Sequence, residues 1–159
     1  MDALYKLVAY QQQWQVAITH IQSLADGDAV DLLFYTEVYS VWTPIMRACV
    51  RSGPLVLVQR MITKAQLDSS KRYLLAITDS GGFTALHFAA YHCDPAVLEL
   101  LIREHPLALC SINGYGFTPL QHATAFNRLA HISLLTDTTN ALAERNFAAL
   151  AARVHGDER

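Results

Sequence analysis

Apolar residues recur along this chain at intervals of three and four positions, the spacing that places them on one face of an α-helix. Two short helices are expected within residues 2–24, where Leu4, Leu7 and Val8 share one face and Trp14 begins a second apolar stripe. Beyond them the pattern predicts helices at about 44–51, 55–65, 84–91, 96–104, 118–126 and 129–135. A last helix is expected from Ala141 to about Val154, capped by residues 138–140 (TTN).

One short motif stands at the start of three of these predicted helices. Its clearest copy is residues 82–90 (GFTALHFAA), and residues 116–123 (GFTPLQHA) repeat it 34 positions later. A weaker copy, residues 42–49 (WTPIMRAC), lies 41 positions earlier, with Val41 where the other copies have glycine. Self-similarity at a period of this length predicts a stack of small repeated units.

The residue types in the motif fit the start of a helix. Thr43, Thr84 and Thr118 stand where an N-cap oxygen can accept hydrogen bonds from the first-turn amides. Pro44 and Pro119 follow at the first helical position, where a missing N–H costs nothing. Before two of the threonines, an Asp or Asn stands three positions ahead of a glycine, which is typical of a tight turn.

A period near 33 residues that carries T-P-L-H-x-A is the sequence mark of ankyrin repeats, so the chain resembles an ankyrin-repeat protein. The resemblance covers about residues 37–136 directly. It implies an all-α solenoid of helix-turn-helix repeats joined by hairpin-like fingers, with terminal capping helices. His87 matches the family position whose ring bonds backbone between neighbouring repeats. Gln121 stands at that position in the third repeat, with His122 one place later.

On this basis residues 1–159 form a single ankyrin-repeat domain. Repeats are expected at 37–65, 79–106 and 113–136, between a degenerate N-terminal capping repeat at 1–28 and a C-terminal capping helix at 137–155. Residues 66–78 exceed what a repeat boundary needs and are interpreted as a surface insertion loop. Residues 29–42 replace the first finger, and a short helix and an irregular hairpin both stay open there.

Composition excludes several classes of function. The chain is 52% hydrophobic and 16% charged, below the roughly 25% charged of ordinary soluble proteins. A net charge of −2, with Lys71 and Arg72 as the one basic cluster, disfavours nucleic acid as a partner. No apolar run is long enough for membrane insertion, and no secretory signal is expected. A homo-oligomer is not indicated.

Three cysteines without metal-type spacing indicate free thiols in an intracellular, reducing compartment, with cytoplasm and nucleus favoured and organellar import left open. Cys49 and Cys110 lie in apolar stretches and are expected to be inert filler. His92 and Cys93 are adjacent, but no second ligand pair follows them. No catalytic, cofactor-binding or metal site is therefore predicted.

Aromatic residues mark the expected binding surface. Trp42, Phe83 and Phe117 each precede a motif threonine, so stacked repeats would align them. The resemblance implies that this position, the finger tip and the end of the first helix face the concave, partner-binding side. That set adds Arg51, Tyr91, His92, Tyr115 and Phe126. The competing interpretation is that the three aligned aromatics only pack against the next finger.

Two main hypotheses for function follow. The first is a non-enzymatic module that binds a protein partner through the concave face of its repeats. The second is a structural subunit held permanently in a large complex with several partners, which the high apolar and low charged content favours. An enzyme is only a remote third, because no nucleophile or phosphate-binding motif is present.

Overall fold

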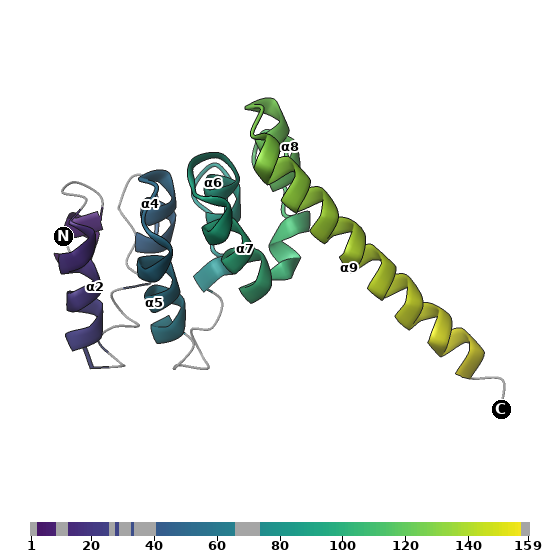
Figure 1. The fold of residues 1–159 in the computed structure, drawn as a ribbon, viewed down its shortest axis with the longest axis horizontal. Helices are drawn as coiled ribbons and strands as arrows, with labels where there is room; N and C mark the ends of the chain where they lie inside the picture. The colour runs from purple at the N-terminus through teal and green to yellow at the C-terminus, as the bar shows by residue number, and fades with distance from the viewer. Residues whose placement is uncertain are drawn as a thin grey trace.

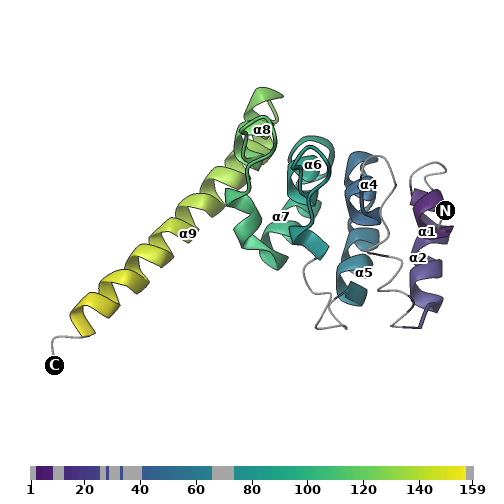
Figure 2. The same ribbon diagram turned by 180° about the vertical axis from the view of Figure 1, so that it is seen from behind.

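The computed structural model arranges the helices in a row, with a long last helix that runs away from the row (Figures 1 and 2). It describes residues 3–8, 13–25, 28, 33, 41–65 and 74–156. In these ranges the regular elements are helices: α1 (Ala3–Lys6), α2 (Trp14–Ser23), α4 (Pro44–Val50), α5 (Leu55–Ala65), η2 (Leu74–Ala76), α6 (Ala85–His92), α7 (Pro95–Glu104), η3 (Pro106–Cys110), α8 (Pro119–Ala125) and α9 (Leu129–Gly156). The all-α repeat architecture expected from the sequence is confirmed. None of the helices described is both long and apolar enough to cross a bilayer.

Each repeat begins with a capped helix, as predicted. The Oγ1 atoms of Thr43, Thr84 and Thr118 accept hydrogen bonds from the third amide of α4, α6 and α8 respectively. In α6 and α8 the third residue also accepts a bond from the threonine amide, through His87 Nδ1 and Gln121 Oε1. These reciprocal bonds satisfy two amides that would otherwise lack partners, so the motif fixes where each helix starts.

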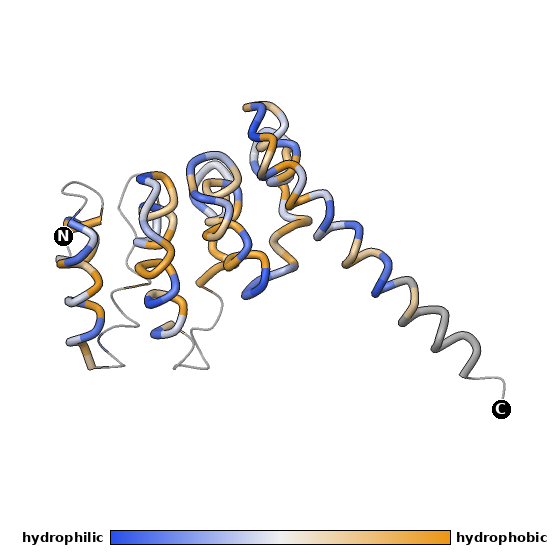
Figure 3. Tube along the Cα trace, viewed as in Figure 1, coloured by the Kyte–Doolittle hydropathy of each residue, from blue (hydrophilic) through white to orange (hydrophobic). Residues whose placement is uncertain are grey.

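The core lies between the helix layers and continues from repeat to repeat. α4, α6 and α8 pack side by side, and α5 and α7 pack behind them. Small residues such as Ala89 and Ala90 are fully buried in α6, so neighbouring first helices approach closely. Leu57, Met61 and Leu98 fill the space behind with larger buried side chains. Hydropathy varies along each of these helices, as expected for elements with one buried face (Figure 3).

The second and third fingers are joined directly. The Gly114 amide donates to the Gly81 carbonyl at 2.7 Å. Gly82 has a φ of +76°, and a Cβ added to it would lie 3.0 Å from the Gly114 nitrogen. Glycine is required at Gly82 for both conformation and space. His87 Nε2 donates to the Phe117 carbonyl at 3.0 Å, which adds a second link between these repeats.

Val41 adopts the backbone conformation of the glycine that it replaces. Its φ is +55°, in the left-handed region occupied by Gly82 and by Gly116 at +82°. A β-branched residue is disfavoured there because its Cβ crowds the backbone. The first repeat therefore keeps the geometry of the motif without its usual residue.

The C-terminal segment differs from the sequence-based prediction. A separate capping helix after residues 138–140 is wrong, because α9 runs without interruption from Leu129 to Gly156. Thr138 Oγ1 donates to the Leu134 carbonyl at 2.7 Å and Thr139 Oγ1 to the Leu135 carbonyl at 2.6 Å. These hydroxyls bond back onto the preceding turn of the same helix, so they do not start a new one.

Two smaller expectations also change. Most of the predicted insertion loop, residues 66–73, lies outside the described residues, as does most of 29–42. Leu74 begins η2 and is 2% exposed, so the last part of the insertion belongs to the core and not to a surface loop. Cys49 is buried, as expected of inert filler, whereas Cys110 is exposed at the end of η3 and does not fill the core.

Candidate functional site

The exposed side of α4, α6 and α8, together with the fingers at 79–83 and 113–117, is called the inner face here. Aromatic rings run across it in an unbroken series of contacts. We call this series the aromatic band, and its members are Trp42, Phe83, Phe88, Tyr91, Tyr115, His122 and Phe126.

The band is continuous over three repeats. Trp42 meets the edge of Phe88 with ring centroids 5.1 Å apart, and Phe88 stacks on Phe83 at 5.5 Å. Phe83 then contacts His122 at 5.5 Å. These separations lie in the range in which aromatic pairs attract, so the rings support one another in fixed orientations.

The far end of the band is the more exposed part. Tyr91 and Phe126 have ring centroids 4.2 Å apart, and His122 lies 5.1 Å from Phe126. Phe126 is 49% exposed, whereas Tyr91 is only partly exposed. Tyr91 stands seven residues after Thr84, whereas Phe126 stands eight after Thr118 and is equivalent to His92. The two rings meet because the ends of α6 and α8 lie side by side.

The three aligned aromatics do not share one environment. Trp42 is partly buried, with its Nε1 donating to Asp79 Oδ2 at 2.8 Å in the next finger. Phe83 contacts Tyr115 of the third finger at 5.9 Å. Phe117 is 42% exposed. Packing against the next finger therefore describes Trp42 and Phe83, while Phe117 presents its ring to solvent.

Sequence reasoning did not place His122 and Phe88 in the band. His122 Nδ1 donates to the His87 carbonyl at 3.1 Å, which holds the ring between Phe83 and Tyr91. One signal was present, because His122 and Phe126 are four residues apart on a predicted helix and must share a face. Phe88 is buried at 8% exposure and packs against the rings of Trp42 and Phe83.

Gln121 performs only part of the role of the histidine that it replaces. Its Oε1 accepts from the Thr118 amide at 2.8 Å, as His87 Nδ1 accepts from the Thr84 amide at 3.2 Å. The neighbouring residue His122 bonds to the preceding repeat, where its Nδ1 donates to the His87 carbonyl. The third repeat thus keeps its capping box.

Positive groups gather where the inner helices end. Arg51 is exposed at the C-cap of α4, and Ser52 Oγ donates to the His92 carbonyl at 2.8 Å, so this turn lies against the end of α6. An Arg128 guanidinium N–H donates to the Cys93 carbonyl at 3.4 Å. Burial lowers the pKa of His92, and the charges of His122 and Arg128 lower it further. We call this group, the cations Arg51 and Arg128 with the uncharged His92 ring, the basic edge.

The two buried cysteines, Cys49 and Cys93, offer no reactive centre. Cys93 Sγ donates to the Cys49 carbonyl at 3.4 Å, and both side chains are buried. A hydrogen bond with Cys93, together with burial, raises the pKa of the Cys49 thiol, which keeps it protonated and unreactive. The described ranges contain no group of three or more His, Cys, Asp or Glu that could hold a metal ion.

Comparison with known families agrees with the repeat architecture. The family model described as ankyrin repeats (3 copies) matches residues 45–146, which is more than half of the chain. The chain belongs to the ankyrin-repeat family. Ankyrin repeats are in general modules for protein–protein interaction. No curated protein matches the sequence of this chain.

Proposed function

We propose that this chain is a non-enzymatic binding module that holds an apolar segment of a protein partner along the aromatic band. The observation that carries the proposal is the contact between Tyr91 and Phe126, whose rings extend an internally supported series to the surface. Aromatic side chains that are already held in place lose little conformational freedom on binding, and they are over-represented among the residues that dominate interface energies.

The site residues take different roles in this proposal. Tyr91 and Phe126 would anchor the partner, and Phe117 would extend the contact towards the third finger. Tyr115, which is 76% exposed at the finger tip, and Arg51 would form the more polar rim with His92. Trp42 and Phe83 would contribute mainly by holding the neighbouring fingers and the deeper rings in place.

A double variant tests the proposal. Tyr91→Ala with Phe126→Ala removes two anchors whose side chains are not part of the buried core. The matched control is Leu55→Ala with Val56→Ala on α5, where the side chains are 39% and 44% exposed on the opposite side. Tagged chains are incubated with an extract of the source cells, and the captured proteins are compared by quantitative mass spectrometry.

We expect the inner-face variant to lose specific partners that the control retains, with the thermal midpoint of each variant measured in parallel. Loss of about 2 kcal/mol or more in binding is typical when such an anchor is truncated. An inner-face variant that is folded and captures the same proteins as the control would overturn the proposal.

The second candidate, a permanent subunit of a larger complex, has its own supporting observation. Leu107, Ile112 and Leu129 are 73%, 64% and 71% exposed and lie outside the aromatic band. Apolar residues on several surfaces suit a chain with several neighbours. Sedimentation of the isolated chain distinguishes the two, because a free module should be monodisperse and an orphaned subunit should aggregate.

A further inference from the structure

The inner helices carry an unbalanced charge. α4, α6 and α8 contain no Asp or Glu, and the turns that follow them contain only Asp94. The side chain of Asp94 accepts from the Ala96 amide as the N-cap of α7, so this carboxylate is already used. Asp79 in the second finger is also used, since its two oxygens accept bonds from Gly81, Phe83 and Trp42.

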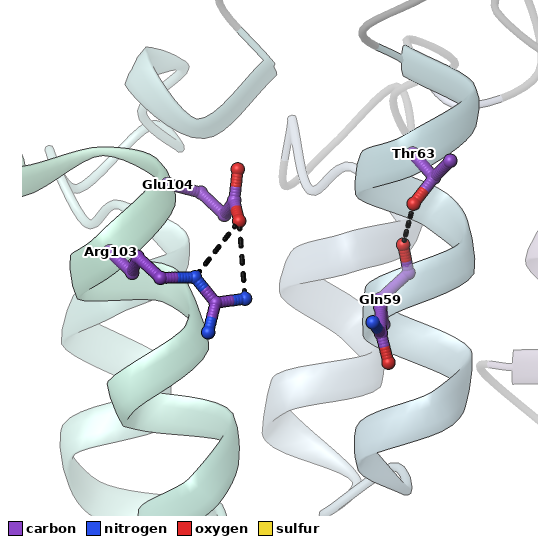
Figure 4. Close-up of polar contacts among 4 residues, drawn as sticks. All are labelled: Gln59, Thr63, Arg103 and Glu104. Atoms are coloured by element: carbon purple, nitrogen blue, oxygen red, sulfur yellow. Dashed lines mark hydrogen bonds and ion pairs between the residues drawn. The ribbon is translucent and has the colours of Figure 1, made fainter.

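The second helices carry charges of both signs, with Arg60 and Lys64 on α5 and Glu99, Arg103 and Glu104 on α7. Arg103 of α7 forms an ion pair with Glu104 at 3.3 Å, and Thr63 Oγ1 donates to the Gln59 carbonyl within α5 at 2.9 Å (Figure 4). Among the described residues, the carboxylates on the helices of the repeats lie on α7 and α9. In the described part of the chain, the one carboxylate in the turns after the inner helices is Asp94, which the Ala96 amide holds, so the two arginines of the basic edge outnumber it.

From this asymmetry we infer that the segment held along the aromatic band is acidic as well as apolar, and that its carboxylates lie at the basic edge against Arg51 and Arg128. The inference rests on the proposed function and adds the chemistry of the partner to it. Tyr91 lies 4.3 Å from His92 between ring centroids, so the basic edge borders the most exposed part of the band. A peptide with an apolar residue beside an acidic one would meet both surfaces together.

The positions of the cations also have a structural role, which must be separated from binding. Cations near a helix C-terminus are stabilised by its exposed carbonyls, and Arg128 donates to one of them. That role explains why basic residues stand there, but it does not explain why the adjoining helices carry no acid. Nε of Arg128 is buried and has no hydrogen-bond partner among the described residues, while the side chain as a whole is partly exposed.

The test uses the whole chain and a phage library of random 16-residue peptides. Selected peptides are synthesised with a fluorescent label, and their affinities are measured by anisotropy. Each is compared with a copy in which Asp and Glu are replaced by Asn and Gln. Two charge-reversal variants are measured, Arg51→Glu alone and Arg51→Glu with Arg128→Glu. The matched control reverses two exposed cations elsewhere, Arg60→Glu with Arg145→Glu.

We expect the selected peptides to carry net negative charge and apolar residues. Their Asn/Gln copies should bind about tenfold more weakly or worse, and Arg51→Glu should weaken them similarly, while the control leaves affinity within about threefold. The single variant keeps the test valid if the double variant is unstable, since Arg51 is exposed and its side chain forms no hydrogen bond or ion pair with the rest of the described structure.

Different failures lead to different conclusions. Neutral or basic peptides, or equal affinity for the Asn/Gln copies, would overturn the acidic partner. If the binding of such peptides is still lost in the Tyr91→Ala, Phe126→Ala variant, the proposed function stands and only the acidic character of the partner is overturned. Peptides that ignore both the aromatic band and the basic edge, or a library that yields no binder, would overturn both.

Discussion

Trp42 and Asp79 form a hydrogen bond between repeats, in which the indole Nε1 donates to Oδ2 at 2.8 Å. The equivalent pair at the next boundary is Phe83 and Asn113. Oδ1 of Asp79 and Oδ1 of Asn113 make the same two bonds within their own fingers. A carboxylate thus accepts a hydrogen bond from the indole N–H of Trp42, whereas at the next boundary Phe83 has no donor and the buried Nδ2 of Asn113 has no hydrogen-bond partner among the described residues.

The first prediction tests the pairing of the Asp79 carboxylate with the Trp42 indole N–H. Asp79→Asn keeps the bonds within the finger, as Asn113 shows, but can place an amide donor against the Trp42 donor. We expect a loss of about 1–3 kcal/mol in the free energy of unfolding, because a partly buried N–H loses a charged acceptor. Urea denaturation measures this loss. The control is Asp94→Asn, at an exposed N-cap where Asn serves nearly as well as Asp. Equal midpoints for the two variants would contradict the prediction.

Local features of the repeats were predictable from the sequence because they depend on neighbouring residues. The threonine caps, the proline after two of them and the Asp or Asn turn each involve atoms within about five residues of chain. The Trp42–Asp79 bond was not predictable, since the two residues are 37 positions apart and meet only in the stacked register. The hydroxyls at 138 and 139 misled for a related reason: threonine can cap a new helix or bond back within an existing one.

Part of the candidate site was predictable from the sequence, because the repeat motif indicates where each first helix ends. Tyr91 and Phe126 were identified because each stands where the first helix of its repeat ends, and their rings are in contact. By the family motif alone, His122 is out of register by one position. Its place in the band depends on a backbone bond to the preceding repeat, which no local pattern reveals.

The second prediction concerns pH. Burial lowers the pKa of His87, and the hydrogen bond to the Phe117 carbonyl only partly opposes this. Nδ1 accepts from the Thr84 amide, so a proton there would break the capping box. The unfolded chain binds this proton near pH 6.5 and the folded chain only at lower pH, so the free energy of unfolding should fall as pH drops through about 6.5.

His87→Gln tests this assignment. Glutamine should keep the cap as Gln121 does, lose the bond to Phe117, and lack the titrating group. We expect the variant to be less stable than the parent at pH 7.5 but to lose less further stability between pH 7.5 and 5.5. Denaturant midpoints across that range give the comparison. A variant with the same pH dependence as the parent would show that His87 does not contribute to it.

The third prediction distinguishes a continuous α9 from two separate helices. Asn140 is exposed and lies within α9, where alanine is favoured over asparagine by about 0.5 kcal/mol. Asn140→Ala should therefore be neutral or slightly stabilising. If residue 140 instead capped a separate helix, the same change would cost about 1 kcal/mol. Asp94→Ala provides the reference, because Asp94 is an observed N-cap and its loss should cost about that much.

The last prediction concerns the left-handed conformation of Val41. Removing its side chain also removes contacts, since it is only 37% exposed, so Val41→Gly alone would mix two effects. Val41→Ala loses nearly the same contacts but retains a Cβ at a φ of +55°. At ordinary positions glycine is worse than alanine by about 0.5–1 kcal/mol because it gains more freedom on unfolding. In the left-handed region a Cβ costs roughly 1–2 kcal/mol, so here the order should reverse.

We therefore expect Val41→Gly to be more stable than Val41→Ala by up to about 1 kcal/mol in urea denaturation. Gly116→Ala gives the reciprocal measurement. Gly116 has a φ of +82° with no atom within 4 Å of an added Cβ, so alanine there adds strain without a clash. The difference between glycine and alanine should have the same sign at both positions, since both need the same backbone conformation. If alanine is better at 41 and worse at 116, the first repeat does not share the glycine geometry of the third, and Val41 is then an ordinary turn residue.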